Sequence, residues 1–430
     1  MQYELHSELR SIYETTELYP HTLRVTMTMK DMIDGERLKD AVRLTMRRYP
    51  YFRVRLVREG ERLFFERNDR DIAVRNTYEA ATLGAESVGF HLLAFGWWKN
   101  KIHIDAHHCY LDGGAMDSLF KTLLYYYCSS YYEKALPADG VRLSDSPIDP
   151  GEWEDPYRTP VRAGSDTRLP KWDGAAFSLA DTPGLRLTER RVTYNIRIPE
   201  RAFMRFNFSS EGSPATVIAL FLARAIESVR PDAPEPVSIA LCLNQRKALG
   251  TPLAHNSLVG CVDLVFRPSM RRMGFAEQVT CFRGMVALQS DNDAVLEEVR
   301  AYQSFMAEVE RLPTIEERRA VCHAAMLERS RRCTATVSYA GRSNFGAAAR
   351  YIQEFDVLPA TALPSIETPV NVEISAVNGH FFVNFIQRFE ESCYFDAFIR
   401  QLRENDIDYD VIYCEEARFP RMQLPPNPEA

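Results

Sequence analysis

The sequence predicts a mixed α/β (α+β) protein built from two subdomains. Strand-like and helix-like segments alternate along both halves of the 430-residue chain, and each half closes with a hairpin followed by a helix, at 87–132 and 370–404. Between the halves, residues 137–183 hold seven prolines and show no regular period, as linkers and surface loops do. The expected parts are an N-terminal subdomain over 1–136, a crossover linker over 137–190, a C-terminal subdomain over 191–422 and a disordered tail over 423–430.

Composition narrows the class of protein. Apolar residues make up 46% of the chain, which is ordinary for a folded protein. Lys and Arg total 52 against 59 Asp and Glu, and the net charge of −7 argues against nucleic acid as a partner. The most apolar run stops at Arg224, and no signal peptide or membrane span is predicted. Nine scattered cysteines without CxxC pairs suit free thiols, so we expect a cytoplasmic monomer.

Elements of the first half follow from side-chain spacing. Residues 22–30 are rich in β-branched residues and methionine, which favours a strand. Asp34 fits a helix N-cap, because apolar residues recur at helical spacing after it until Pro50 stops the helix. Alternating apolar residues then predict strands, and a long one-sided apolar pattern predicts the closing helix. The expected elements are hairpins at 52–66 and 87–107 and a helix that starts near Gly114.

Elements of the second half follow in the same way. Residues 192–198 alternate as a strand, and Pro199 opens a helix. Ser213-Pro214 has the order of an N-cap followed by a first helical residue, which predicts a buried helix to about Arg230. Asn378-Gly379 lies between two alternating runs, which is a strong hairpin signal. The other expected elements are strands at 237–243, 258–266, 334–340, 351–357, 370–377 and 380–387, and helices at 275–289, 292–311, 314–331 and 395–404.

A cluster of histidines lies at the end of the predicted hairpin at 87–107, just before the helix that starts near Gly114. His103, His107 and His108 lie within six residues, together with Asp105 and Asp112. Strand alternation places His107 on one face with His103 and Asp105, and His108 on the other. The two adjacent histidines therefore point in opposite directions, and we expect them to have different roles.

Three interpretations of this cluster remain open on the residues alone. His103, Asp105 and His107 could share a metal, although such sites usually need further ligands and the later histidines are isolated. The cluster could equally consist of satisfied polar residues at a strand end. In the third interpretation, a histidine before a helix N-terminus acts as a general acid or base, since its pKa lies near neutral. Asp112 would then fix the loop, and Gly113-Gly114 would allow a tight turn.

The segment His107-His108-x-x-x-Asp112-Gly113 is identified as the HHxxxDG motif of the condensation-domain and chloramphenicol-acetyltransferase-like acyltransferase superfamily. Its setting fits, because the motif follows an alternating strand and precedes an amphipathic helix near residue 110.

Two further segments resemble the same superfamily. Asn244-x-Arg246, followed by Asn256 and Gly260, resembles its Asn/Arg stretch. Residues 338–342 resemble the Ser-x-x-Gly-Arg segment of bacterial alcohol acetyltransferase-like members. The resemblance implies two stacked αβ subdomains arranged in a V around a central tunnel.

The resemblance also implies a reaction. His108 would act as general base while an alcohol or amine attacks an acyl thioester, with no covalent enzyme intermediate. The donor would be acyl-CoA or a phosphopantetheinyl carrier thioester such as an acyl carrier protein, with no bound cofactor and no metal. Asp112 would be structural, with Arg246 as a candidate partner, and His107 would support the loop. The backbone N–H of Gly113 is a candidate oxyanion donor at the positive end of a helix.

The remaining expected site residues lie in the second half. By the same resemblance, Ser338, Tyr339, Gly341 and Arg246 are the candidates for substrate binding. Ser338 and Tyr339 would line the wall opposite the motif, or they could be ordinary strand residues. An alternative of another class is a catalytically silent module of the same fold that docks carrier proteins or partner enzymes.

Overall fold

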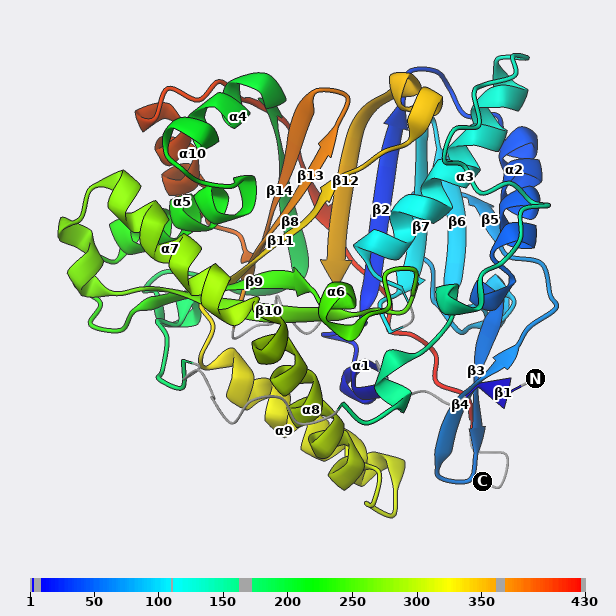
Figure 1. Ribbon diagram of the computed structural model, residues 1–430, viewed down its shortest axis with the longest axis horizontal. Coiled ribbons are helices and arrows are strands. Elements are labelled where there is room, and N and C mark those ends of the chain that lie inside the picture. The colour runs from blue at the N-terminus through cyan, green and yellow to red at the C-terminus, as the bar shows by residue number, and fades with distance from the viewer. Residues whose placement is uncertain (1, 4–8, 110, 162–171, 361–367, 427–430) are drawn as a thin grey trace.

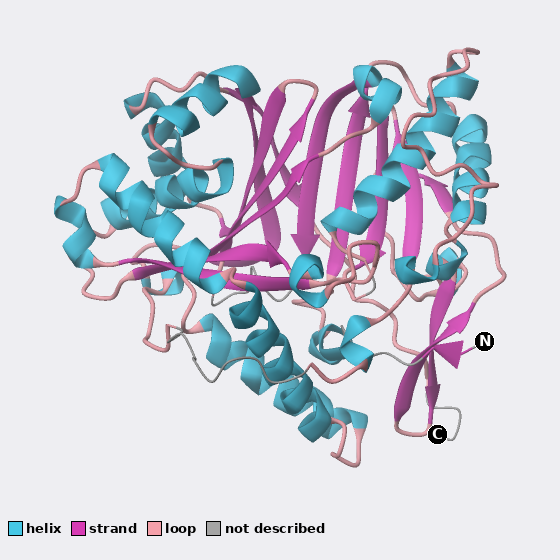
Figure 2. Cartoon of the chain, in the orientation of Figure 1, coloured by secondary structure: helices cyan, strands magenta, loops and turns pink. Residues whose placement is uncertain are grey.

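Two large β-sheets lie side by side in the computed structural model, each with helices packed against it (Figures 1 and 2). The structure describes residues 2–3, 9–109, 111–161, 172–360 and 368–426. One sheet has five strands and the other has seven, and a small sheet of three strands lies near the N-terminus. The predicted mixed α/β class is therefore confirmed.

The five-stranded sheet belongs mainly to the first half of the chain. Its strand order is β12-β2-β7-β6-β5. Helices α2 and α3 pack on it, and their apolar faces enclose one hydrophobic core with the sheet (Figure 1). The elements are β2 (Thr22–Met29), α2 (Gly35–Arg48), β5 (Val74–Asn76), β6 (Leu93–Trp98), β7 (Lys101–His107), α3 (Gly113–Tyr131) and β12 (Ile352–Ala360).

The seven-stranded sheet has the order β10-β9-β11-β13-β14-β8-β15, and helices α4, α5, α7 and α10 belong to the core on one of its faces (Figure 1). Helix α5 is buried almost all round, as its apolar sequence predicts. The strands are β8 (Leu187–Pro199), β9 (Val237–Asn244), β10 (Val259–Phe266), β11 (Ala335–Arg342), β13 (Val370–Val377), β14 (His380–Phe389) and β15 (Asp410–Ala417). The helices are α4 (Glu200–Ser209), α5 (Pro214–Val229), α7 (Phe275–Gln289) and α10 (Cys393–Glu404).

The remaining elements lie outside these two layers. Helices α8 and α9 run as a pair that projects from the body of the molecule, and α1 contacts α9 (Figure 1). The elements are β1 (Gln2–Tyr3), α1 (Leu9–Glu14), β3 (Val54–Glu59), β4 (Arg62–Arg67), α6 (Arg246–Leu249), α8 (Asn292–Val309) and α9 (Ile315–Ser330). No single described helix has the length and apolar composition of a membrane span; only α4 and α5, bent by 80°, reach both when counted together.

Two predicted turns form as their chemistry requires. Asn378 and Gly379 both have positive φ, at 50° and 76°, which is the backbone that a two-residue hairpin turn needs. Ser213 caps α5 by accepting a hydrogen bond from the Thr216 N–H, with Pro214 as the first helical residue. Both the hairpin of β13 and β14 and the start of α5 are confirmed.

One strand departs from the expected division of the chain. Strand β12 falls within the range assigned to the C-terminal subdomain, but it pairs antiparallel with β2 in the other sheet. It also adjoins the neighbouring sheet, because the Val357 N–H donates to the Asn384 side chain at 2.9 Å. The chain therefore crosses back between the sheets after β11, which local sequence patterns do not reveal.

Parts of the linker are buried, and the tail differs from expectation. In the linker, the Trp153 side chain is 43% exposed, whereas its neighbour Glu152 is buried. Gln423 was placed in a disordered tail, but its N–H donates to the Leu83 carbonyl at 2.8 Å. Residues 427–430 of that tail lie outside the described residues. Strands β1 and β15 and helix α1 were not predicted.

Candidate active site

The histidine motif occupies the connection from β7 to α3. The His108 N–H donates to the His21 carbonyl at 2.7 Å, so the backbone bonding of β7 to β2 continues into the loop. Asp112 is the N-cap of α3, and its carboxylate accepts the Ala115 N–H at 3.0 Å. Gly113 and Gly114 form the start of α3, and neither is among the glycines with positive φ.

Asp112 joins this loop to the other half of the chain. Its carboxylate accepts two hydrogen bonds from Arg246, at 2.8 and 2.9 Å, in a two-bond ion pair. The Leu258 N–H donates to the same carboxylate at 3.1 Å. Only 2% of Asp112 is exposed, so these partners replace the water that the charge has lost. The predicted partnership of Asp112 with Arg246 is present in the structure.

Arg246 was also a candidate for substrate binding, and its contacts point to another role. All five guanidinium N–H groups have acceptors in the protein. Two bonds go to Asp112, and the others go to the Asn244 side chain and to the carbonyls of Ala254 and Asn256. Since no donor is left over, Arg246 holds the loop rather than offering a hydrogen bond to a substrate.

His107 is buried and has a partner at each ring nitrogen. Its Nδ1 accepts the Cys109 N–H at 3.2 Å, so the ring proton lies on Nε2. Nε2 is 3.1 Å from the Thr15 hydroxyl, which in turn donates to the Ser11 carbonyl. Burial lowers the pKa of His107 to about 3, and this keeps the imidazole neutral. These contacts fit the predicted supporting role.

His108 remains partly accessible, whereas His107 is buried. Its Nδ1 lies 3.1 Å from the Ser257 hydroxyl, and within the described part of the chain Nε2 makes no hydrogen bond. Burial lowers the pKa of His108, while the Asp112 charge and the residue's own backbone act in the opposite direction. A neutral imidazole that uses Nδ1 for positioning can accept a proton at Nε2.

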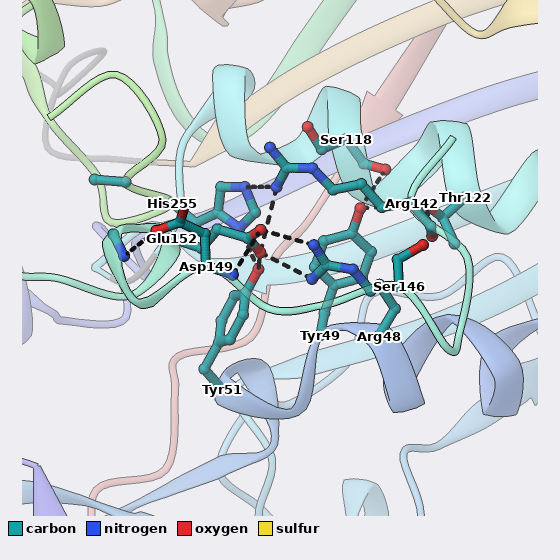
Figure 3. Close-up of polar contacts among 12 residues, drawn as sticks. Arg48, Tyr49, Tyr51, Ser118, Thr122, Arg142, Ser146, Asp149, Glu152 and His255 are labelled. Carbon is teal, nitrogen blue, oxygen red and sulfur yellow. Dashed lines mark hydrogen bonds and ion pairs between the residues drawn. The ribbon is translucent and has the colours of Figure 1, made fainter. Parts of the chain in front are cut away.

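A polar cluster holds the loop that contains Ser257 through its neighbour His255. Figure 3 shows this cluster around Glu152 and His255. The cluster is centred on Glu152 of the linker, whose carboxylate receives two hydrogen bonds from Arg48, at 2.7 and 2.8 Å. The Glu152 carbonyl accepts the His255 N–H at 2.8 Å, two residues before Ser257. The linker therefore fixes the loop that contacts His108.

The side chain of His255 completes the cluster (Figure 3). The Tyr51 hydroxyl donates to Glu152 at 2.7 Å and lies 2.6 Å from Nδ1 of His255. Arg142 donates to Nε2 at 3.0 Å, which requires the ring proton on Nδ1 and lets Tyr51 accept it. Burial and the Arg142 charge lower the pKa of His255 to about 4, so this ring is neutral.

Ser257, His255 and Glu152 were not singled out from the sequence. Ser257 and His255 lie in a short loop without a motif, and Glu152 lies in the proline-rich linker. Their contacts bridge segments more than a hundred residues apart, such as the one from Arg48 to Glu152. The signal available was the pattern of Asn244-x-Arg246 and Asn256. Asn256 lies between His255 and Ser257, but the pattern assigns no role to either neighbour.

The three remaining candidates lie on or near β11. Ser338 pairs across the sheet with Glu373, on the face away from the C-terminal core. Tyr339 points to the opposite face and packs against that core, 6.1 Å from the Phe381 ring. Gly341 has φ of 98°, which favours glycine. No hydrogen bond joins these residues to the motif loop within the described ranges. Tyr339 packs against the C-terminal core, whereas Ser338 and Gly341 do not belong to it.

The residues considered as metal ligands, His103, Asp105 and His107, have other roles in the structure. The Asp105 carboxylate takes two hydrogen bonds from Arg24, at 2.6 and 2.8 Å. Burial, together with the Arg24 charge, lowers the pKa of His103 to about 3. Among the described residues, no group of three or more His, Cys, Asp or Glu side chains could hold a metal ion.

Known structures share this architecture. TRI101 of F. sporotrichioides, solved with coenzyme A and T-2, aligns over 97% of this chain and 99% of its own at 9% identity, with a TM-score of 0.58. The condensation domain of the Monacolin K polyketide synthase MokA aligns over 94% and 96% at 14% identity, with a TM-score of 0.57. Polyketide synthase associated protein 5 from Mycobacterium tuberculosis aligns over 94% and 98% at 14% identity, with a TM-score of 0.58.

The chain therefore has the two-subdomain fold of condensation domains and chloramphenicol-acetyltransferase-like proteins, as the motif predicted. The likeness at these identities concerns the fold. No family model matches the sequence, and no curated protein matches it.

Proposed function

We propose that the protein is an acyltransferase that moves an acyl group from a thioester to an alcohol or an amine. The observation that carries the proposal is the state of His108. Its imidazole has a lowered pKa, its Nδ1 is 3.1 Å from Ser257, and Nε2 makes no hydrogen bond to a described residue. This is the arrangement a general base needs, in a fold that accommodates coenzyme A in TRI101.

In the proposed reaction, Nε2 of His108 removes the proton of the acceptor hydroxyl or amine as that group attacks the thioester carbonyl. The C–S bond then breaks, and the proton passes from His108 to the departing thiolate. The thioester is already activated, so no covalent enzyme intermediate is required. The N–H of Gly113, at the positive end of α3, is our candidate for stabilising the oxyanion.

The proposed co-substrate is acyl-CoA or an acyl thioester carried on the phosphopantetheine of a carrier protein. Two similarities support this range: TRI101 is solved with coenzyme A, and the MokA domain belongs to a polyketide synthase. Of the candidates on β11, Ser338 and Gly341 remain proposed wall residues, whereas Tyr339 packs into the core.

The test is a panel of thioester donors and acceptors. Purified protein would be given acyl-CoAs of increasing chain length with assorted alcohols and amines, and release of free thiol would be followed. The same acceptors would then be offered with acylated carrier proteins. We expect acceptor-dependent thiol release with one donor class. If neither donor class is consumed, the acyltransferase proposal fails and the alternative of a docking module is favoured.

A further inference from the structure

Two cysteines face each other across β9 and β10. Cys242 and Cys261 are directly opposite in the antiparallel register, and both are free thiols. The Asp263 N–H and carbonyl both bond to the Gln289 side chain, each at 2.9 Å, so Asp263 and its partner Ala240 form a non-hydrogen-bonded pair. Hydrogen-bonded and non-hydrogen-bonded pairs alternate along such strands, so the pair of 242 with 261, two steps further, is also non-hydrogen-bonded.

This position brings the two side chains close together. The Cα atoms of a non-hydrogen-bonded pair lie about 4.5 Å apart, near the lower end of the range that a disulfide spans. Directly opposed residues lie on the same face of the sheet. The neighbours Leu241 and Val262 belong to the C-terminal core, so Cys242 and Cys261 lie on the other face. Both cysteines are partly accessible, unlike the buried Cys333 at the start of β11. Geometry and access therefore both permit a bond between the two sulfurs.

The pKa values of the two thiols differ in a way that favours thiol–disulfide exchange. Their mutual contact lowers the pKa of Cys261 and raises the pKa of Cys242. Burial instead raises the pKa of Cys128, Cys322 and Cys333 to about 12. The thiolate is the attacking form of cysteine, so Cys261 is the nucleophile of the pair.

We propose that Cys242 and Cys261 form a thiol–disulfide exchange site that takes low-molecular-weight disulfides, such as glutathione disulfide, as its oxidant. The Cys261 thiolate attacks one sulfur of the oxidant, whose S–S bond breaks to release one small thiol. Cys242 then attacks the resulting mixed disulfide and releases the second small thiol. The two protons of the protein thiols end on the two released thiols, and the protein gains one disulfide.

The experiment uses the unmodified protein. Reduced protein is equilibrated with glutathione disulfide, the remaining thiols are blocked with an alkylating agent, and peptides are mapped by mass spectrometry without reduction. We expect the loss of two free thiols at this pair and one cross-linked peptide that joins Cys242 to Cys261. The exposed Cys414 acts as an internal control, because it can form only a mixed disulfide with glutathione.

The variants Cys242→Ser and Cys261→Ser sharpen the result. Cys242→Ser is expected to stop at a mixed disulfide on Cys261, whereas Cys261→Ser should leave Cys242 reduced because the nucleophile is missing. The proposal is overturned if Cys414 is glutathionylated in the unmodified protein while no 242–261 cross-link forms. It is also overturned if Cys242 in the Cys261→Ser variant reacts with glutathione disulfide as fast as Cys261 does in the Cys242→Ser variant.

Discussion

Asp112 and Arg246 are 134 residues apart in sequence, and their side chains form a buried two-bond ion pair at 2.8 and 2.9 Å. Through this pair, the loop that carries His108 is attached to the segment between β9 and β10. The pair has five further hydrogen bonds: Asp112 accepts from Ala115 and Leu258, and Arg246 donates to Ala254, Asn256 and Asn244. The ion pair therefore connects the two halves of the chain close to His108, the proposed base.

Removal of the Asp112 charge should destabilise the fold. Asp112→Asn keeps a residue suited to capping α3 but leaves Arg246 buried without its counter-ion, which costs about 3–5 kcal/mol. Denaturant unfolding measures the free energy. The matched control is Asp410→Asn, which breaks an exposed pair with Arg197 and should cost at most about 1 kcal/mol. Equal losses of unfolding free energy in the two variants would show that the buried pair of Asp112 and Arg246 does not hold the two segments together.

Removal of the Ser257 hydroxyl should reduce turnover without changing substrate binding. Ser257→Ala takes away the partner of Nδ1, so the imidazole of His108 spends less time with its proton on that nitrogen. One such bond is worth about 1 kcal/mol, so kcat should fall by about fivefold at unchanged KM. Ser209→Ala removes an exposed hydroxyl on α4 as a control. A rise in KM alone would contradict this role for Ser257.

Neutralisation of Glu152 should loosen the loop around Ser257. Burial opposes the charged form of Glu152, but hydrogen bonds from Arg48 and Tyr51 outweigh it and lower its pKa to about 2. Glu152→Gln leaves Arg48 unpaired, and we expect a loss of about 3–5 kcal/mol and faster hydrogen exchange at residues 254–258. Tyr51→Phe, which keeps the ion pair, should have a smaller effect. Unchanged hydrogen exchange at residues 254–258 would show that the Glu152 cluster does not hold this loop in place.

His107 should make stability depend on pH in acid. Its pKa is about 3 when folded and near 6.5 when unfolded, so between these values the unfolded chain binds the extra proton. Stability contributed by neutral His107 is thus full above pH 6.5 and is lost as the pH falls toward 3. His107→Asn retains an acceptor for the Cys109 N–H without a titrating ring. Its melting temperature should fall less steeply than that of the unmodified protein between pH 6.5 and 4.5, and parallel curves would refute the assignment.

Local chemistry made much of the fold predictable. The Asn378-Gly379 turn and the Ser213-Pro214 cap each depend on a few neighbouring residues, and both form where predicted. The histidine motif is local as well, because a strand, a loop and a helix in sequence place His108 before α3. Residues whose role is set by adjacent backbone could therefore be identified without a structure.

Long-range contacts account for what the sequence did not reveal. Strand β12 has an ordinary strand pattern, but its pairing with β2 joins segments more than three hundred residues apart. Ser257 and Glu152 acquire their roles only when the linker and the loop after β9 meet at the motif. Strand alternation was available for Tyr339, but it needed knowledge of which face of β11 covers the core.

The central claim is that His108 is the base of an acyl transfer, and one comparison tests it most directly. Thiol release from the best donor and acceptor pair would be measured for the unmodified protein and for His108→Ala, with melting temperatures recorded for both. We predict that His108→Ala loses about 10²–10⁴-fold in kcat while its melting temperature stays close to that of the unmodified protein. A His108→Ala variant that folds and keeps nearly full activity would contradict the assignment of His108 as the base.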